Sequence, residues 1–226
     1  MVEIVNLSKK FGSFQALDSI NMNIQKGTIV GVMGENGAGK TTLFRCIAGL
    51  EEYEGRIVSE LNPLKNHLGF LPTEPYFFSK ITAKEYIRLL CNARGKKKLD
   101  IEDKNIFDLP LNQYVSTFST GMKKKLAFTA ILLQENDCLI LDEPFNGVDI
   151  QSNFIISEII LRLKMLHKTI IIASHIFSSL SEICDEIFVL HQGKLIKSVQ
   201  KEHFAALEIE MKTFSIDDKI DRLNLW

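Results

Sequence analysis

Residues 34–42 of this chain read Gly-Glu-Asn-Gly-Ala-Gly-Lys-Thr-Thr, and this run constrains the fold more than any other. It matches the pattern G-x-x-x-x-G-K-[ST], in which glycines let backbone N–H groups turn inward around phosphate oxygens. Lys40 would place a positive charge against the β- and γ-phosphates, and the hydroxyl of Thr41 could bind Mg²⁺. The run therefore predicts a phosphate-binding loop, whose ligand contacts come from Asn36, Gly37, Ala38, Gly39, Lys40, Thr41 and Thr42.

The sequence on either side of this run supports the interpretation. Residues 28–33 are β-branched and apolar, as in a buried parallel strand, and residues 42–48 have helical apolar spacing that closes at Gly49. The order strand, loop, helix would point the positive end of the helix at the phosphates. The alternative is a glycine-rich turn with an incidental lysine, which this context disfavours.

Composition sets broad limits on what the chain does. Its 226 residues suffice for one large domain or two small lobes, and a formal net charge of −1 gives no global signature of nucleic-acid binding. The cysteines are scattered singly, as buried thiols of a cytosolic protein are: Cys46, Cys91, Cys138 and Cys184. Neither a signal peptide nor a run of about 20 apolar residues is visible, so work at a membrane would require recruitment by another chain.

The pattern of elements predicts an α/β fold. Strands are expected over residues 2–7, 16–24, 28–33, 55–58, 68–71, 138–141, 169–173, 186–190 and 194–199, and helices over 42–48, 122–133, 151–166 and 177–183. Strands that alternate with helices imply a mostly parallel, doubly wound sheet, preceded here by an N-terminal antiparallel β subdomain. No motif is evident from residue 201 onward.

Residues 75–118 differ from the rest and read as a small helical subdomain. Thr82 and Glu85 form a capping box for a helix over residues 82–91, a basic run follows at 96–98, and a short acidic helix is expected over 102–107, before Pro110. We therefore expect one domain over residues 1–226, with an α/β core from 1–74 and 119–226.

A second chemical signal lies at residues 139–143, Leu-Ile-Leu-Asp-Glu. An apolar strand that ends in a carboxylate is how phosphate-loop enzymes hold Mg²⁺, which assigns Asp142 to the metal. Glu143 would point to the other face, where it could take a proton from an attacking water. A buried strand that runs into an acidic turn is the simpler alternative.

Several motifs together carry a family resemblance. The chain resembles the nucleotide-binding subunit of an ABC (ATP-binding cassette) transporter over nearly all of its length. The order and spacing of the motifs match that family, which has a phosphate-loop NTPase core with a helical lobe between the first two motifs: GENGAGKTT (34–42), FSTGMKKK (118–125), LILDEP (139–144), NGVD (146–149) and Ser174-His175.

The resemblance implies ATP and Mg²⁺ as ligands and a role for each matching residue. Phe11 would stack on adenine, although an aromatic near a turn is often a core residue. Asp142 would bind Mg²⁺ through water, Glu143 would be the catalytic base, and Lys40 would assist at the phosphates. His175 would contact the γ-phosphate, although a histidine after a strand often has no function.

The segment at residues 118–125 has a physical logic of its own. Ser119 or Thr120 can cap the helix that follows, and Gly121 lets a ligand approach the backbone. The resemblance implies that Ser119 and Gly121 contact ATP held by a partner's phosphate loop, in a homodimer or a heterodimer with a second ATPase subunit, with Asp149 at the interface. The lysines at 123–125 lie in the first helical turn, where a phosphate could offset their repulsion by the helix dipole; a solvated basic face explains them equally well.

The sequence departs from the family pattern in three places. The usual LSGGQ reads Phe-Ser-Thr-Gly-Met at residues 118–122. Thr73 stands where the family usually has a Gln that binds Mg²⁺ and couples the site to the helical lobe; Thr73 offers a hydroxyl of shorter reach, and Glu74 could substitute. The helical lobe is also short, which implies a reduced docking surface.

The resemblance implies an ATP-hydrolysing motor. Closure and opening of the dimer would drive an integral membrane permease subunit, with this chain cytoplasmic and peripheral on the inner face of the membrane. A soluble ABC ATPase acting on nucleic acid or ribosomes is one alternative. Such relatives usually carry two cassettes or a long coiled-coil insertion, and this sequence shows neither, so no nucleic-acid partner is expected. A nucleotide-binding regulatory module with little turnover is the other alternative, motivated by Thr73 and the altered signature.

Overall fold

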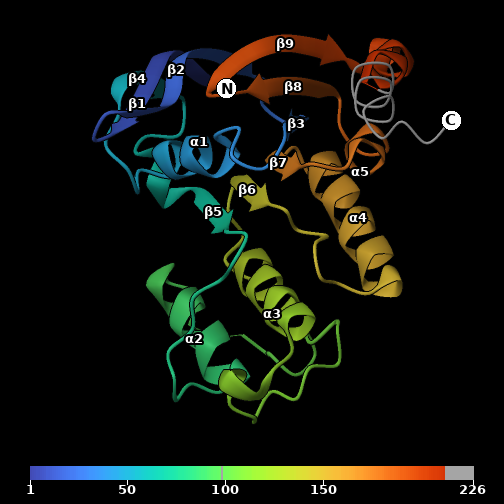
Figure 1. Ribbon diagram of the computed structural model, residues 1–226. Helices are drawn as coiled ribbons and strands as arrows, with labels where there is room; N and C mark the ends of the chain where they lie inside the picture. Colours follow the sequence, from blue (N-terminus) through green and yellow to red (C-terminus); the bar gives the residue numbers. More distant parts are fainter. Residues whose placement is uncertain (98, 212–226) are drawn as a thin grey trace, which may run out of the picture.

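The computed structural model describes residues 1–97 and 99–211. The strands are β1 (Val2–Phe11), β2 (Phe14–Ile24), β3 (Ile29–Met33), β4 (Glu54–Ser59), β5 (Leu68–Leu71), β6 (Cys138–Asp142), β7 (Thr169–Ser174), β8 (Glu186–His191) and β9 (Lys194–Gln200). The α-helices are α1 (Lys40–Ile47), α2 (Ala83–Ala93), α3 (Thr120–Leu132), α4 (Ile150–Met165) and α5 (Phe177–Ser181), with 3₁₀ turns η1 (Leu64–Asn66), η2 (Val115–Thr117) and η3 (Lys201–His203). Figure 1 shows their arrangement.

The larger sheet has the strand order β5-β6-β7-β3-β8-β9. Neighbouring strands are parallel except at the β8–β9 edge, which is antiparallel. Every residue of β3, β6 and β7 is buried, which explains why these strands read as continuous apolar runs in the sequence. The predicted mostly parallel α/β sheet is confirmed.

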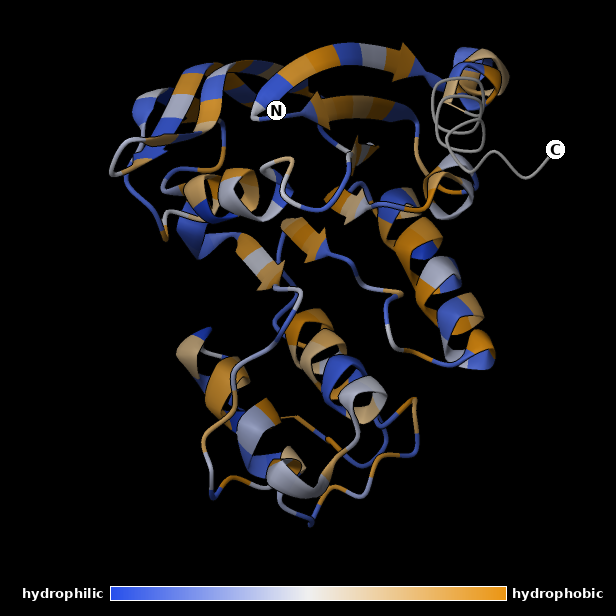
Figure 2. Cartoon of the chain, viewed as in Figure 1, coloured by the Kyte–Doolittle hydropathy of each residue, from blue (hydrophilic) through white to orange (hydrophobic). Residues whose placement is uncertain are grey.

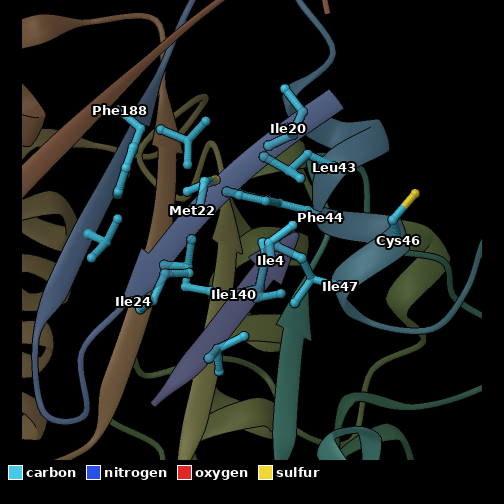
Figure 3. Close-up of a cluster of buried hydrophobic side chains, with 14 of the residues drawn as sticks. Ile4, Ile20, Met22, Ile24, Leu43, Phe44, Cys46, Ile47, Ile140 and Phe188 are labelled. Atoms are coloured by element: carbon cyan, nitrogen blue, oxygen red, sulfur yellow. The ribbon is translucent and has the colours of Figure 1, made fainter. Parts of the chain in front are cut away.

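A smaller antiparallel sheet, ordered β2-β1-β4, forms the predicted N-terminal β subdomain. Its buried side chains share one hydrophobic cluster with α1 and with strands of the larger sheet. Figure 3 shows Phe44 of α1 among Ile4, Ile20 and Met22, and Phe44 is fully buried. Packing of α1 between the sheets fixes the helix that follows the phosphate loop.

Helices α2 and α3 lie side by side below the larger sheet in Figure 1. The predicted capping box is present at the start of α2: Thr82 and Glu85 each accept a hydrogen bond from the other's backbone N–H. Helix α3 packs on both sides, because Leu126 and Ala130 join the cluster around α2 while Ala127 and Phe128 join the cluster around β6 and β7. The boundary at residues 118–119 stays a prediction, since α3 belongs to both packing units.

The prediction of an acidic helix over residues 102–107 is wrong, because the chain forms turns there. The side chain of Asn105 accepts a hydrogen bond from the N–H of Leu109 and donates to its carbonyl, and the carboxylate of Asp100 accepts from the N–H of Asp103. Such local side-chain bonds compete with helical backbone bonds. Burial of Ile101 anchors these turns against the cluster around α2.

Helix α4 covers one face of the larger sheet and exposes apolar as well as polar side chains on its other side. Figure 2 shows hydrophobic and hydrophilic residues alternating along it, with Ile156 and Ile160 buried and Phe154 and Met165 exposed. Within residues 1–97 and 99–211, no helix has the length and apolar character that a membrane crossing requires.

The remaining predictions concern the cysteine thiols, the stretch after β9 and the basic run at residues 96–98. All the cysteines are buried and unpaired, as expected, and burial raises the pKa of the Cys46 thiol to about 11. The stretch after β9, in which no motif was evident, continues into a helix over residues 204–211 whose Phe204 contacts Phe177 of α5. Of the basic run at 96–98, Lys96 pairs with Glu135, whereas residue 98 lies outside the described residues.

Candidate functional site

Most of the predicted site residues meet at the carboxyl ends of four adjacent parallel strands. Thr73 follows β5, Asp142 ends β6, His175 follows β7, and the loop at residues 34–39 follows β3. Parallel strands end at the same edge of a sheet, so residues far apart in sequence converge there. They surround a cavity of about 630 Å³ lined by Phe14, Ala16, Glu35, Asn36, Gly37, Gly39, Lys40, Thr41, Thr42, Thr73, Asp142, Glu143, Asn146 and His175.

The loop wraps around the buried ammonium of Lys40. Lys40 Nζ donates to the carbonyl of Gly34 at 2.6 Å and to that of Glu35 at 3.2 Å. Gly39 caps α1 with φ +108°, in the left-handed region that favours glycine. This geometry places both the ammonium and the N-terminus of α1 at the cavity, where an anion would be stabilised. Of the predicted loop residues, only Ala38 is absent from the lining.

Thr41 and Asp142 form the part of the site that could hold a metal. The Thr41 hydroxyl donates to Asp142 Oδ2 at 2.6 Å. Asp142 is completely buried, and its Oδ1 has no hydrogen-bond partner among the described residues. An unpaired buried carboxylate oxygen is unfavourable, and a hydroxyl beside a carboxylate suits a hard cation. The donor set therefore fits Mg²⁺.

Glu143 lies between two groups that orient its carboxylate. His175 Nδ1 is 3.0 Å from both carboxylate oxygens, and Lys40 Nζ is 3.7 Å from Oε1. The backbone at Glu143 is left-handed, with φ +52°, and its N–H donates to the carbonyl of Ala173. A non-glycine residue held in this region is a constrained one, so the carboxylate is fixed on the cavity wall.

Thr73 lines the cavity, whereas Glu74 is exposed and absent from the lining. The Thr73 carbonyl accepts a hydrogen bond from Lys124 Nζ at 2.6 Å. Lys124 is only 2% exposed, so the interpretation of residues 123–125 as a uniform solvated face is wrong. Burial lowers the pKa of the Lys124 ammonium, an effect that the carboxylates of Asp142, Glu143 and Glu74 oppose.

The aromatic residue at the cavity is not the one that the sequence indicated. Phe14, 65% exposed, lines the cavity together with Ala16, whereas Phe11 does not. Phe11 lies opposite Phe14 across the β1–β2 hairpin, with Lys9 Nζ 4.7 Å from the centre of its ring. The period of two that puts Phe14 and Ala16 on one face of β2 was the signal that could have found Phe14.

Ser119 and Gly121 lie outside this cavity. Ser119 caps α3 as predicted, accepting a hydrogen bond from the N–H of Met122 at 3.2 Å. A Cβ at Gly121 would lie 2.6 Å from the carbonyl oxygen of Gly147, so this glycine allows the start of α3 to approach the loop before α4. Within one chain, the two predicted halves of the ATP site are therefore separate.

Asp149 links helix α3 to helix α4. It caps α4 by accepting a hydrogen bond from the N–H of Ser152 at 2.8 Å, and it pairs with Lys125 at 3.1 Å. The hydrogen bonds from Ser152, then the one from Lys125, hold the pKa of the Asp149 carboxyl well below its usual range.

Comparisons with known proteins agree with this geometry. The family model described as "ABC transporter" matches residues 17–146. The ABC transporter ATP-binding protein NatA of Bacillus subtilis (strain 168) is 33% identical over 217 residues, covering 87% of this chain and 88% of NatA. The bacitracin transport ATP-binding protein BcrA of Bacillus licheniformis is 31% identical over 237 residues, covering 97% of this chain and 76% of BcrA.

The fold also matches solved structures. One, described as the structure of the ATP-binding subunit of an ABC transporter, has a TM-score of 0.78 and 25% sequence identity and covers 99% of both chains. The match extends over the strands and loops that build the cavity, and the family model covers both the phosphate loop and Glu143. The chain therefore belongs to the ABC transporter family, as its ATP-binding subunit.

Proposed function

We propose that this chain binds ATP with Mg²⁺ and hydrolyses it to drive a transporter. The observation that carries the proposal is the convergence of Lys40, the Thr41–Asp142 pair and the Glu143–His175 pair on one cavity. Lys40 and the N-terminus of α1 would bind the phosphates. Thr41 and Asp142 would hold Mg²⁺, which neutralises phosphate charge when it is bound.

Glu143 is the proposed general base for the attacking water. Its carboxylate is fixed beside Lys40 and His175, so a water placed between it and a terminal phosphate would be oriented for in-line attack. His175, whose side chain is 41% exposed, can contact both Glu143 and a bound phosphate. Thr73 would face the metal from the neighbouring strand end, and Phe14 rather than Phe11 is our proposed contact for the base.

A complete site would need two copies, or one copy and a second ATPase subunit. Ser119 and Gly121 lie at the N-terminus of α3, outside the cavity of their own chain. That helix end can bind a phosphate presented by another chain, and a head-to-tail arrangement would then form two equivalent sites. ATP would thereby hold the two subunits together.

The membrane partner would be a separate permease subunit, with this chain bound at the cytoplasmic face. Support comes from relatives whose names give a transport role, such as BcrA. A hollow of about 550 Å³ between α1, β5 and α2 is a suitable docking place, because apolar side chains line much of it, among them Leu50, Phe70, Pro75, Tyr76 and Leu90. The cargo would be chosen by the permease.

The test compares steady-state ATP hydrolysis by wild type and Glu143→Gln. Loss of the base should lower kcat by at least about 10²-fold while ATP still binds. Glu158→Gln is the matched control, since Glu158 lies on α4 and forms an exposed pair with Arg162 away from the cavity. Equal rates for Glu143→Gln and wild type would refute the catalytic assignment, whatever the control shows.

A further inference from the structure

Lys124 is a buried cation whose hydrogen-bond partners are main-chain carbonyls. Its Nζ donates to the carbonyl of Thr73 at 2.6 Å and to the carbonyl of Glu143 at 3.1 Å. Among the described residues, no carboxylate lies within ion-pair distance of this ammonium. A buried charge without a paired countercharge is unfavourable, so the geometry of its two carbonyl contacts needs an explanation.

These two carbonyls belong to the ends of adjacent strands at the cavity. Thr73 follows β5 and Glu143 follows β6, and the strands pair in parallel directly beside each other. Lys124 comes from α3, so one ammonium connects three elements at the edge of the cavity. Its neighbour Lys125 contacts Asp149 and Ser152 instead, so the connection is specific to one position of the helix.

The contact to Glu143 acts on a constrained residue. Glu143 has φ +52°, and its carbonyl accepts from the N–H of Asn146 at 3.2 Å as well as from Lys124. The orientation of this peptide determines where the Glu143 carboxylate lies relative to His175 and Lys40. A donor on the carbonyl therefore fixes the side chain through the backbone.

We propose that Lys124 is a positioning residue for hydrolysis, which couples the start of α3 to the carboxylate of Glu143 and to Thr73. The proposal rests on the proposed role of Glu143 as the base. Ser119 caps the same helix five positions earlier, so a shift of α3 on contact with a second chain moves the ammonium, and with it both carbonyls. Assembly of the composite site and alignment of the base are thus linked through one side chain.

The test is the Lys124→Met variant, which keeps an unbranched apolar stem and removes the donors. We expect kcat for ATP hydrolysis to fall about 10- to 100-fold, because a small displacement of a catalytic group has effects of this size. The dissociation constant for ATP should change less than about threefold, since Lys124 does not line the cavity. Lys124→Arg, which keeps the charge and the donors, should recover part of the lost turnover.

A control variant separates positioning from stability. Lys164→Met removes a part-buried lysine that pairs with Asp185 away from the cavity. It should lower Tm and leave kcat within about twofold of wild type, as expected for a change that touches no reacting group. If Lys124→Met does not fold, Lys124→Gln takes its place. Its side chain is shorter than that of lysine and carries an uncharged amide donor, and a loss of at least about fivefold in kcat is expected.

Two results would overturn the proposal. One is a kcat within about twofold of wild type for Lys124→Met, or for Lys124→Gln where that variant is used. The other is additivity in single-turnover assays. Lys124→Met should cause no further loss of rate in the Glu143→Gln background. A loss as large as the one it causes in wild type would show that Lys124 does not act through Glu143. If Glu143→Gln itself keeps full activity, the proposed role of Glu143 as the base fails; if only Lys124→Met does, that role stands without this link.

Discussion

At the scale of single residues, the chemistry of the site follows from how polar groups are buried. Asp142 is completely buried, with one carboxylate oxygen bonded to Thr41 and the other without a partner among the described residues. Such a group is stabilised by a cation that both Thr41 and Asp142 can reach. The unpaired oxygen is thus a structural reason to expect that ATP binds together with Mg²⁺.

We predict that Asp142→Asn weakens binding of ATP with Mg²⁺ by at least about tenfold, because one charged ligand of a divalent ion is lost. Binding of ATP in the presence of a chelator should change much less, since Lys40 and the loop remain. Isothermal titration with and without Mg²⁺ measures both. Equal weakening under the two conditions would contradict the assignment of Asp142 to the metal.

Most residues of the candidate site could be predicted from the sequence, because short motifs fix their backbone context. Lys40, Thr41, Asp142, Glu143 and His175 were identified by this route, and all of them lie at one cavity. Phe14 and Lys124 were missed. Their roles depend on tertiary packing: the hairpin decides which aromatic faces the cavity, and the packing of α3 against β5 and β6 decides which lysine of three is buried.

At the scale of elements, the N-terminus of helix α4 contributes a stability that depends on pH. Its N-cap Asp149 accepts hydrogen bonds from Ser152, and its carboxyl pKa is lowered well below the usual range. A carboxylate whose pKa is lower in the folded state stabilises the fold above its unfolded pKa of about 3.9, and this stabilisation is lost as the pH falls through lower values.

We predict that wild type is more stable than Asp149→Asn above pH about 4, and that the difference shrinks toward zero as the pH falls below that value. Asn still caps the helix but does not titrate. Urea midpoints measured from pH 7 down to pH 3 give the comparison. Asp149→Ala, which lacks the cap, should be less stable than Asp149→Asn throughout, and a pH-independent difference between wild type and Asp149→Asn would contradict the prediction.

The elements themselves were mostly predictable, with one instructive failure. The buried strands and the capped helix α2 follow from apolar runs and from the Thr82–Glu85 box, both local properties of the sequence. The predicted helix at residues 102–107 fails because the side chain of Asn105 bonds to the backbone of Leu109. Composition alone did not reveal that competition.

At the scale of the whole molecule, the strand order creates the site and also divides it. The order β5-β6-β7-β3 brings Thr73, Glu143, His175 and the loop together. The same fold carries Ser119 to the far end of α3, beyond the cavity of its own chain. We therefore expect one chain to hold half of each ATP site, completed by a second subunit.

The most direct test of this central claim is sedimentation of Glu143→Gln with saturating ATP and Mg²⁺. Since bound ATP is not turned over by this variant, we predict a dimer of twice the 25.7 kDa chain mass, and a monomer without nucleotide. Adding Ser119→Arg to the variant should leave ATP bound but abolish the dimer. A monomer that binds ATP in Glu143→Gln would contradict a composite site built from two copies of this chain, and a dimer that forms equally well with Ser119→Arg would contradict the assignment of Ser119 to that site.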